Sequence, residues 1–233
     1  MIALVVIFLP CLIGCILQGI FIAVEHKKKY VAAVVLKGSA SLMFCLFGFI
    51  GFLMHYCNEC DNTLPLCVFI GLLFGALGDI LLNLRFVFEK IGQKIFLGGI
   101  AAFLTGHILY LAALIPFSES LLVCIIAGVI VAAIILTVIF KSFEVKLSFK
   151  IFGIVYIGAV VLMTSIAIGN CITGGFELWR LLYAIGAVLF TASDVVLIFN
   201  TFGPETKFSL RITNLSLYYL GQLFIASCLL YCK

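Results

Sequence analysis

The chain has 233 residues, of which 65% are hydrophobic and only 10% are charged, with a mean hydropathy of +1.36. Soluble domains contain roughly 45–50% apolar and about 25% charged residues, so the composition excludes a water-soluble fold. The net charge of +4 arises from basic residues in predicted loops, where membrane topology accounts for them, and no nucleic-acid partner is expected.

Apolar runs between polar breaks predict eight transmembrane helices, because a spanning helix needs about 20 mainly apolar residues. The first run lacks the basic n-region of a cleavable signal peptide, so it is expected to remain as the first span. The predicted fold class is an all-α integral membrane protein, a bundle of eight helices forming a single transmembrane domain over residues 1–233. The spans lie near residues 2–24, 31–54, 64–84, 95–115, 120–140, 149–169, 177–199 and 210–231.

Basic residues mark every odd-numbered connection between these spans. The even-numbered connections, 55–63, 116–119 and 170–176, contain no Lys or Arg. Because basic loops stay in the cytosol, the odd connections are expected to be cytosolic and both termini lumenal or exterior. Eleven of the 14 Lys and Arg residues lie in the odd connections or at the span ends next to them: Lys27, Lys28, Lys29, Arg85, Lys90, Lys94, Lys141, Lys146, Lys150, Lys207 and Arg211.

The second connection carries Cys57 and Cys60 in a C-x-x-C arrangement. Such a pair can be redox-active or bind a metal, but a zinc site needs a second pair or histidines at fixed spacing. An incidental or locally oxidised pair is therefore the preferred interpretation, and no metal site is predicted.

Two pairs of segments indicate an internal repeat. Residues 75–82 (Gly-Ala-Leu-Gly-Asp-Ile-Leu-Leu) resemble residues 191–197 (Thr-Ala-Ser-Asp-Val-Val-Leu), and residues 36–43 resemble residues 156–163. Matches between the third and seventh spans and between the second and sixth favour two parallel four-helix repeats.

Four ionisable residues lie well inside predicted spans, away from the span ends: Lys37, Asp79, His107 and Asp194. Such residues cost about 2.5–3.5 kcal/mol each to insert and mark functional sites by default. At a rise of about 1.5 Å per residue, Lys37, Asp79 and Asp194 lie roughly 9–14 Å inside the cytosolic ends, and His107 lies deeper. A purely structural role, in which Lys37 pairs with one aspartate and the other ties helices together, is the alternative to a functional polar cavity. Convergence at one depth favours the cavity, with polar companions Tyr110, Tyr156, Ser193, Tyr218, Tyr219 and Gln222.

At these residues the sequence resembles the YhhN-like family of multispanning membrane proteins, which includes the animal lysoplasmalogenases. The likeness runs in order over nearly the whole chain. One departure is Gly38, which stands where the family often has proline after the lysine. The matching segments are Lys37 after an apolar run, Gly78-Asp79, Phe103-x-x-Gly106-His107-x-x-Tyr110, Gly186-Ala-x-Leu-Phe190-x-x-Ser193-Asp194 and Tyr218-Tyr219-Leu-x-Gln222.

The resemblance implies an enzyme of the endoplasmic reticulum membrane that acts on lysoplasmalogens with ethanolamine or choline headgroups. It would release a fatty aldehyde and the glycerophospho compound with no required cofactor. The lysophospholipid substrate is expected to enter sideways from the bilayer, so membrane lipids are the expected surroundings. Whether the chain forms a homodimer is left open.

The chemistry of vinyl-ether hydrolysis suits two carboxyl groups. A neutral acid donates a proton to carbon, and an ionised carboxylate stabilises the resulting cation and activates water, as paired carboxylates do in glycosidases. Asp79 and Asp194 are the predicted catalytic residues, and either can take either role. Lys37 beside one of them would keep that one ionised. The residues predicted to orient water or the substrate are Lys37, His107, Tyr110, Tyr156, Ser193, Tyr218 and Gln222.

Two other classes of protein use paired intramembrane aspartates. A proton-coupled secondary transporter of a small or lipid-like solute would suit the carboxylates and the repeat, but the predicted spans lack breaks at matching places. Intramembrane aspartyl proteases carry Gly-x-Gly-Asp and Pro-Ala-Leu, whereas residues 76–79 read Ala-Leu-Gly-Asp and no Pro-Ala-Leu occurs. The hydrolase is preferred, and the transporter is kept as the alternative.

Overall fold

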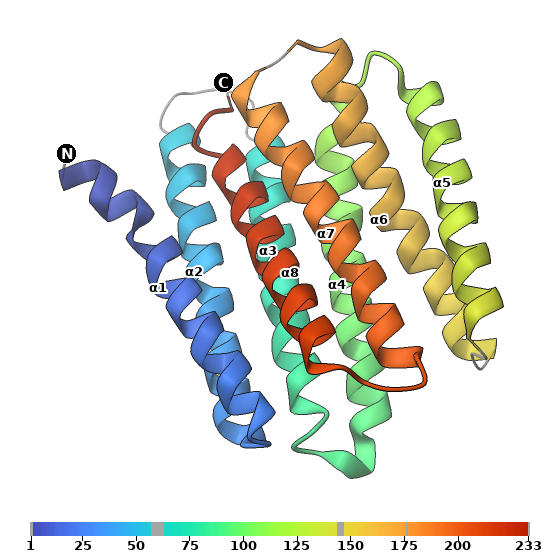
Figure 1. Ribbon diagram of the computed structural model, residues 1–233. Coiled ribbons are helices and arrows are strands. Elements are labelled where there is room, and N and C mark those ends of the chain that lie inside the picture. Colours follow the sequence, from blue (N-terminus) through green and yellow to red (C-terminus); the bar gives the residue numbers. More distant parts are fainter. Residues whose placement is uncertain (1, 57–62, 144–146, 176, 233) are drawn as a thin grey trace. The chain divides into compact units, whose positions relative to one another are not determined.

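The computed structural model describes residues 2–56, 63–143, 147–175 and 177–232. These residues form eight α-helices and two short 3-10 helices, without a strand in the described ranges (Figure 1). The all-α prediction is confirmed, and each of the eight α-helices overlaps one predicted span. The bounds are α1 Ile2–His26, α2 Tyr30–Tyr56, α3 Thr63–Leu84, η1 Glu89–Ile91, α4 Gly92–Leu114, η2 Ile115–Phe117, α5 Leu121–Ser142, α6 Leu147–Thr173, α7 Leu178–Phe202 and α8 Phe208–Cys228.

Seven of these helices, α1 to α7, are long and apolar enough to cross a membrane. Many large apolar side chains point outwards, among them Leu122 at 71% and Val123 at 66% exposure on α5, as expected of surfaces that face lipid. The chain is therefore a multi-pass integral membrane protein. The more polar α8 carries Arg211, Asn214 and Gln222, so the eighth crossing stays a prediction.

The described chain divides into two compact units. Unit 1 comprises residues 1–109 and 226–233, and unit 2 comprises residues 110–225. Unit 1 therefore holds α1, α2, α3, most of α4 and the end of α8, and unit 2 holds the end of α4, α5, α6, α7 and most of α8. The prediction of a single transmembrane domain stays a prediction.

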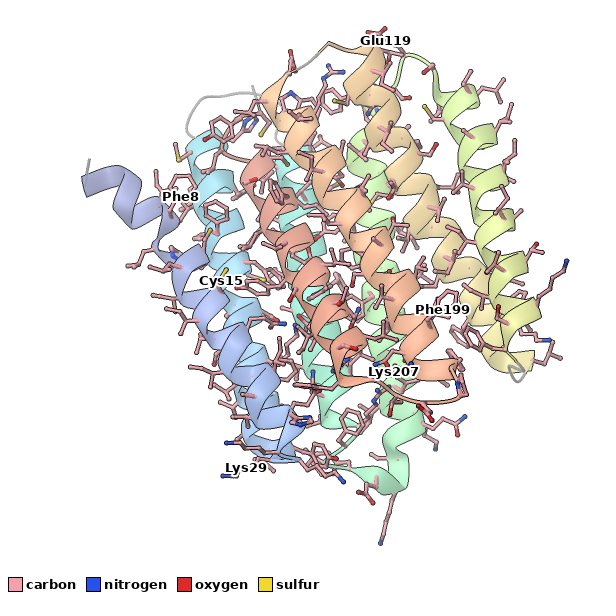
Figure 2. The ribbon with its side chains drawn as sticks, viewed as in Figure 1. Phe8, Cys15, Lys29, Glu119, Phe199 and Lys207 are labelled. Atoms are coloured by element: carbon pink, nitrogen blue, oxygen red, sulfur yellow. The ribbon has the colours of Figure 1, made fainter. Side chains whose placement is uncertain are left out.

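In unit 1, α1 packs on α2 and α2 packs on α3. Glycine brings α3 and α4 close together, because a Cβ on Gly106 would lie 3.0 Å from the carbonyl oxygen of Gly71. The two basic connections lie at one end, where the rings of Tyr30 and Phe86 stack with centroids 5.2 Å apart and where Figure 2 labels Lys29. At the other end α1 begins and α8 ends (Figure 1). An even number of crossings requires this arrangement, and the side of the membrane that the termini face stays a prediction.

In unit 2, α5 packs on α6 and α6 packs on α7. The ring centroids of Phe143 and Phe199 lie 5.2 Å apart, so the end of α5 contacts the end of α7. Figure 2 shows Lys207 at this end of the unit and Glu119 at the opposite end. Basic connections thus gather at one end of each unit, as the alternation of charge predicts. Cys57 and Cys60 lie outside the described residues.

Candidate active site

The first group of predicted site residues lies in unit 1, where α1, α2 and α3 meet around Lys37. The Lys37 ammonium Nζ lies 3.4 Å from Oδ1 of Asp79 and donates a hydrogen bond to Oε1 of Gln18 at 3.2 Å. The Ser41 hydroxyl donates to Oδ2 of Asp79 at 2.5 Å. Exposure is 1% for Lys37 and 4% for Asp79, so the two charges are held away from solvent and paired with each other.

The local sequence explains how α2 delivers this cluster. Lys37 and Ser41 are four residues apart, so they share one face of the helix and both reach Asp79 on α3. A Cβ on Gly38 would lie 3.3 Å from the Ile80 side chain. Gly38, which departs from the expected proline, therefore permits close approach of α2 to α3.

The second group lies in unit 2, around Asp194 on α7. Asp194 is 4% exposed, and the Tyr156 hydroxyl on α6 donates to its Oδ2 at 2.8 Å. No Lys or Arg of the described residues forms an ion pair with Asp194. The two aspartates thus differ in their partners, because Asp79 has an ammonium and a hydroxyl whereas Asp194 has a hydroxyl.

A third group joins the end of α4 to α8 within unit 2. The Tyr110 hydroxyl donates to Oε1 of Gln222 at 2.9 Å, and Nε2 of Gln222 donates to the Tyr218 hydroxyl at 3.4 Å. The Tyr183 hydroxyl donates to the backbone oxygen of Tyr110 at 3.1 Å. Three predicted site residues are therefore in one hydrogen-bonded chain of buried groups.

Two other predicted residues form hydrogen bonds with backbone oxygens. His107, in unit 1, is buried on α4, and its Nδ1 lies 2.7 Å from the backbone oxygen of Phe103, so Nδ1 carries the proton. The Ser193 hydroxyl donates to the backbone oxygen of Asn214 at 3.0 Å, and the Asn214 amide donates back to Ser193. Ser193 therefore ties α7 to α8.

The structure brings together Lys37 with Asp79, Tyr156 with Asp194, and Tyr110 with Tyr218 and Gln222. Each aspartate belongs to a different unit, and their meeting in one cavity stays a prediction of the sequence. Within the described part of the chain, no group of three His, Cys, Asp and Glu side chains is placed to hold a metal ion.

Two residues that bond within the first group, Gln18 and Ser41, were not predicted from the sequence. Gln18 resembles any polar residue of a first span, and Ser41 reads as a small residue for close helix packing. The spacing could have identified Ser41 as a partner of the same group, because it lies one helical turn after Lys37. Gln18 had no comparable signal, because its partner lies on another helix.

Comparison with protein-family models gives a match over most of the chain. The model of the YhhN family matches residues 32–229 of the chain. That range contains every predicted site residue, whereas Gln18 lies ahead of it. Searches of curated proteins and of solved structures each give no match.

Proposed function

The chain belongs to the YhhN family, and from this membership and its two buried aspartates we propose that it is a lysoplasmalogenase. The proposed reaction is hydrolysis of the vinyl-ether bond of an alkenyl lysophospholipid with an ethanolamine or choline headgroup. The products are a fatty aldehyde and glycerophosphoethanolamine or glycerophosphocholine. The observation that carries the proposal is that each buried aspartate has a hydroxyl donor, whereas among the described residues a lysine pairs with Asp79 and none pairs with Asp194.

The proposed division of roles follows from these partners. Asp79, ion-paired with Lys37 at 3.4 Å, serves as the carboxylate. Asp194, which has no ammonium partner among the described residues, serves as the acid. In glycosidases, two carboxyl groups in unlike surroundings divide acid and base work in the same way.

The reaction then balances without a further reactant except water. Asp194 gives its proton to the outer carbon of the double bond, which leaves an oxocarbenium ion stabilised by the negative charge of Asp79. Water adds to the cation and passes a proton to Asp79, which forms a hemiacetal. The hemiacetal collapses to the aldehyde and the glycerol hydroxyl, and the protons return to their starting sites. No cofactor is part of this scheme.

The single-chain substrate would reach the buried groups sideways from the bilayer, and the proposed location is the endoplasmic reticulum membrane. Lipid access fits a chain in which the polar side chains lie within helices that expose apolar residues. His107, Tyr110, Tyr218 and Gln222 are proposed to orient water or the polar part of the lipid.

The test is to incubate the purified protein with alkenyl and saturated alkyl lysolipids side by side and to measure aldehyde. The proposal expects cleavage of the alkenyl lipid alone and its loss in Asp79→Asn and Asp194→Asn. Full activity of either folded variant would exclude the two-carboxylate mechanism. Uptake of solute into proteoliposomes without product would instead favour the proton-coupled transporter.

A further inference from the structure

Two polar residues follow Asp79 towards the end of α3. Asn83 lies one helical turn further on, is 4% exposed, and donates through Nδ2 to the backbone oxygen of Asp79 at 2.9 Å. Its other amide atom, Oδ1, is buried and has no hydrogen-bond partner among the described residues. Native structures seldom leave a buried amide oxygen without a donor, so we expect a ligand or a water molecule to donate a hydrogen bond to this atom.

Arg85 lies just beyond Asn83. Its amide donates to the backbone oxygen of Leu81 at 3.2 Å, so the helical path of the backbone continues through Arg85. The guanidinium lies 4.6 Å from the ring centroids of both Phe86 and Phe96. A guanidinium stacked on aromatic faces has its five N–H donors in its own plane, and this geometry suits phosphate.

We propose that Asp79, Asn83 and Arg85 contact the lysophospholipid in sequence, from the vinyl ether to the phosphate. The axial distance from Asp79 to Arg85 is roughly 9 Å at the rise of an α-helix. In the substrate, six bonds join the ether-bearing vinyl carbon to phosphorus, an extended span of about 7 Å. Six residues also rotate the helix by about 240°, so Arg85 does not share the face of Asp79 and Asn83. Its long side chain has to reach around the end of α3, where the guanidinium lies against Phe86 and Phe96.

The free hydroxyl on the middle glycerol carbon lies between these two ends of the substrate. Its O–H donates to Oδ1 of Asn83, which supplies the donor that this atom lacks. A lipid acylated at that carbon has no such donor and leaves the buried oxygen without one. Asn83 thereby selects lysolipids and Arg85 selects phospholipids. This inference rests on the proposed function for the identity of the lipid.

The test measures binding instead of cleavage, with the full-length protein in detergent. Three probes serve: the saturated alkyl-ether analogue of lysoplasmenylethanolamine, its methyl ether at the middle hydroxyl, and the corresponding alkylglycerol without phosphate. The first should bind about tenfold to a hundredfold more tightly than the second. In Asn83→Leu this preference should vanish. In Arg85→Gln the affinity for the first probe should fall by about tenfold, and that for the alkylglycerol should not change.

Two control variants match these changes. Asn170→Leu removes another buried amide whose Oδ1 also lacks a partner among the described residues, and Lys94→Gln removes an exposed cation near Arg85 in sequence. Both should keep the preferences of the unmodified protein. A hydroxyl preference that survives in Asn83→Leu, or is absent from the unmodified protein, would overturn the inference. Because the probes have no vinyl ether, a protein that binds them selectively yet releases no aldehyde would refute the hydrolase alone.

A second inference rests on contacts that recur 115 residues apart. Ser41 donates to Oδ2 of Asp79 in unit 1, and Tyr156 donates to Oδ2 of Asp194 in unit 2, with a separation of 38 residues in both cases. A Cβ on Gly106 would lie 3.0 Å from the Gly71 oxygen, and likewise a Cβ on Gly221 would lie 3.0 Å from the Gly186 oxygen. Every residue of the second set is numbered 115 above its counterpart.

The helix bounds obey the same shift. Moved by 115 residues, α3 would start at residue 178, which is where α7 starts, and α4 would start at residue 207, one residue before α8. The shifted α2 would span residues 145–171, against 147–173 for α6. Gly38 and Ile70 then coincide with Gly153 and Ile185.

We infer that α5 to α8 repeat α1 to α4 in this register and that a counter-ion distinguishes the two aspartates. Lys37 corresponds to Phe152 and Gln18 to Ala133. The second copy thus retains the carboxylate and a hydroxyl donor but has neither the ammonium nor the amide. Residue 152 therefore decides whether Asp194 has an ion-pair partner.

The test is Phe152→Lys, which places an ammonium one turn before Tyr156, as Lys37 stands one turn before Ser41. Melting temperatures are measured for Phe152→Lys, for Asp194→Asn and for the double variant, and they should show strong coupling between residues 152 and 194. Aldehyde release by Phe152→Lys should fall at least tenfold. Ile151→Lys, at the adjacent position, is the matched control: Ile151 is 56% exposed against 37% for Phe152, and it lies five residues before Tyr156, so it should show no coupling. Phe152→Gln, a neutral hydrogen-bond donor, should couple with the same sign if the lysine variant does not fold. Absence of coupling in the folded variants, or equal coupling in the control, would overturn the repeat register.

Discussion

Replacement of Lys37 by methionine leaves Asp79 as a buried carboxylate without its ammonium. At the observed separation of 3.4 Å, two unit charges attract by about 5 kcal/mol at an effective dielectric constant of about 20. Measured losses on removing one partner of a buried pair are about 3–5 kcal/mol. The Ser41 hydroxyl still donates to Asp79, which offsets a part of the loss. We expect Lys37→Met to lower the free energy of unfolding by about 3–4 kcal/mol.

A double-mutant cycle separates the ion pair from other effects of the substitution. Lys37→Met, Asp79→Asn and the double variant are unfolded in detergent by heat or denaturant and followed by circular dichroism. The double variant leaves no unpaired charge, so the coupling energy should be about 2–4 kcal/mol. Glu177 and Arg180 form the control pair at nearly the same distance, 3.3 Å, but the Glu177 side chain is 57% exposed. Their coupling should stay below about 1 kcal/mol. Equal coupling in the two cycles would refute the argument from burial.

Two further predictions concern unit 2. Tyr156→Phe removes the hydroxyl that donates to Asp194 at 2.8 Å. This loss should cost about 1–2 kcal/mol of stability and lower aldehyde release about tenfold. An unchanged kcat with an altered melting temperature would contradict a role of Tyr156 in positioning Asp194. Gly221→Ala places a Cβ 3.0 Å from the backbone oxygen of Gly186 and should cost about 1–3 kcal/mol. Gly158→Ala, with no atom within 4 Å of its Cβ, should be neutral or stabilising, and thermal melts compare the two.

The helices could be predicted from the sequence because insertion into lipid requires long apolar runs. Those runs are read without knowledge of tertiary contacts, so α1 to α7 appeared with bounds close to the observed ones. The location of the buried charges was accessible for the same reason, since Lys37, Asp79 and Asp194 interrupt apolar sequence. The eighth span illustrates the limit, because the polar residues of α8 that bond to neighbouring helices also reduce its apolar character.

Partners across helices could not be read in the same way. Helical periodicity gives the face on which a residue lies, but the rotation of one helix against its neighbour depends on packing. Gln18 therefore gave no sign that it accepts a hydrogen bond from Lys37. The register of the repeat was subject to the same limit. The sequence paired residues 36–43 with 156–163, five residues away from the register in which the hydrogen bonds recur, because short apolar segments match in several registers.

The hydrogen bond from Lys37 to Gln18 also bears on how the protein enters the membrane. Synthesis proceeds from the N-terminus, so α2 emerges with its lysine before Asp79 on α3 exists. An ammonium in a span costs about 2.5–3.5 kcal/mol to insert. The amide of Gln18, carried on the helix made first, is the earliest partner available to it. A chain begun at residue 32, where the family match starts, would lose that partner and would have to insert its lysine in its leading segment.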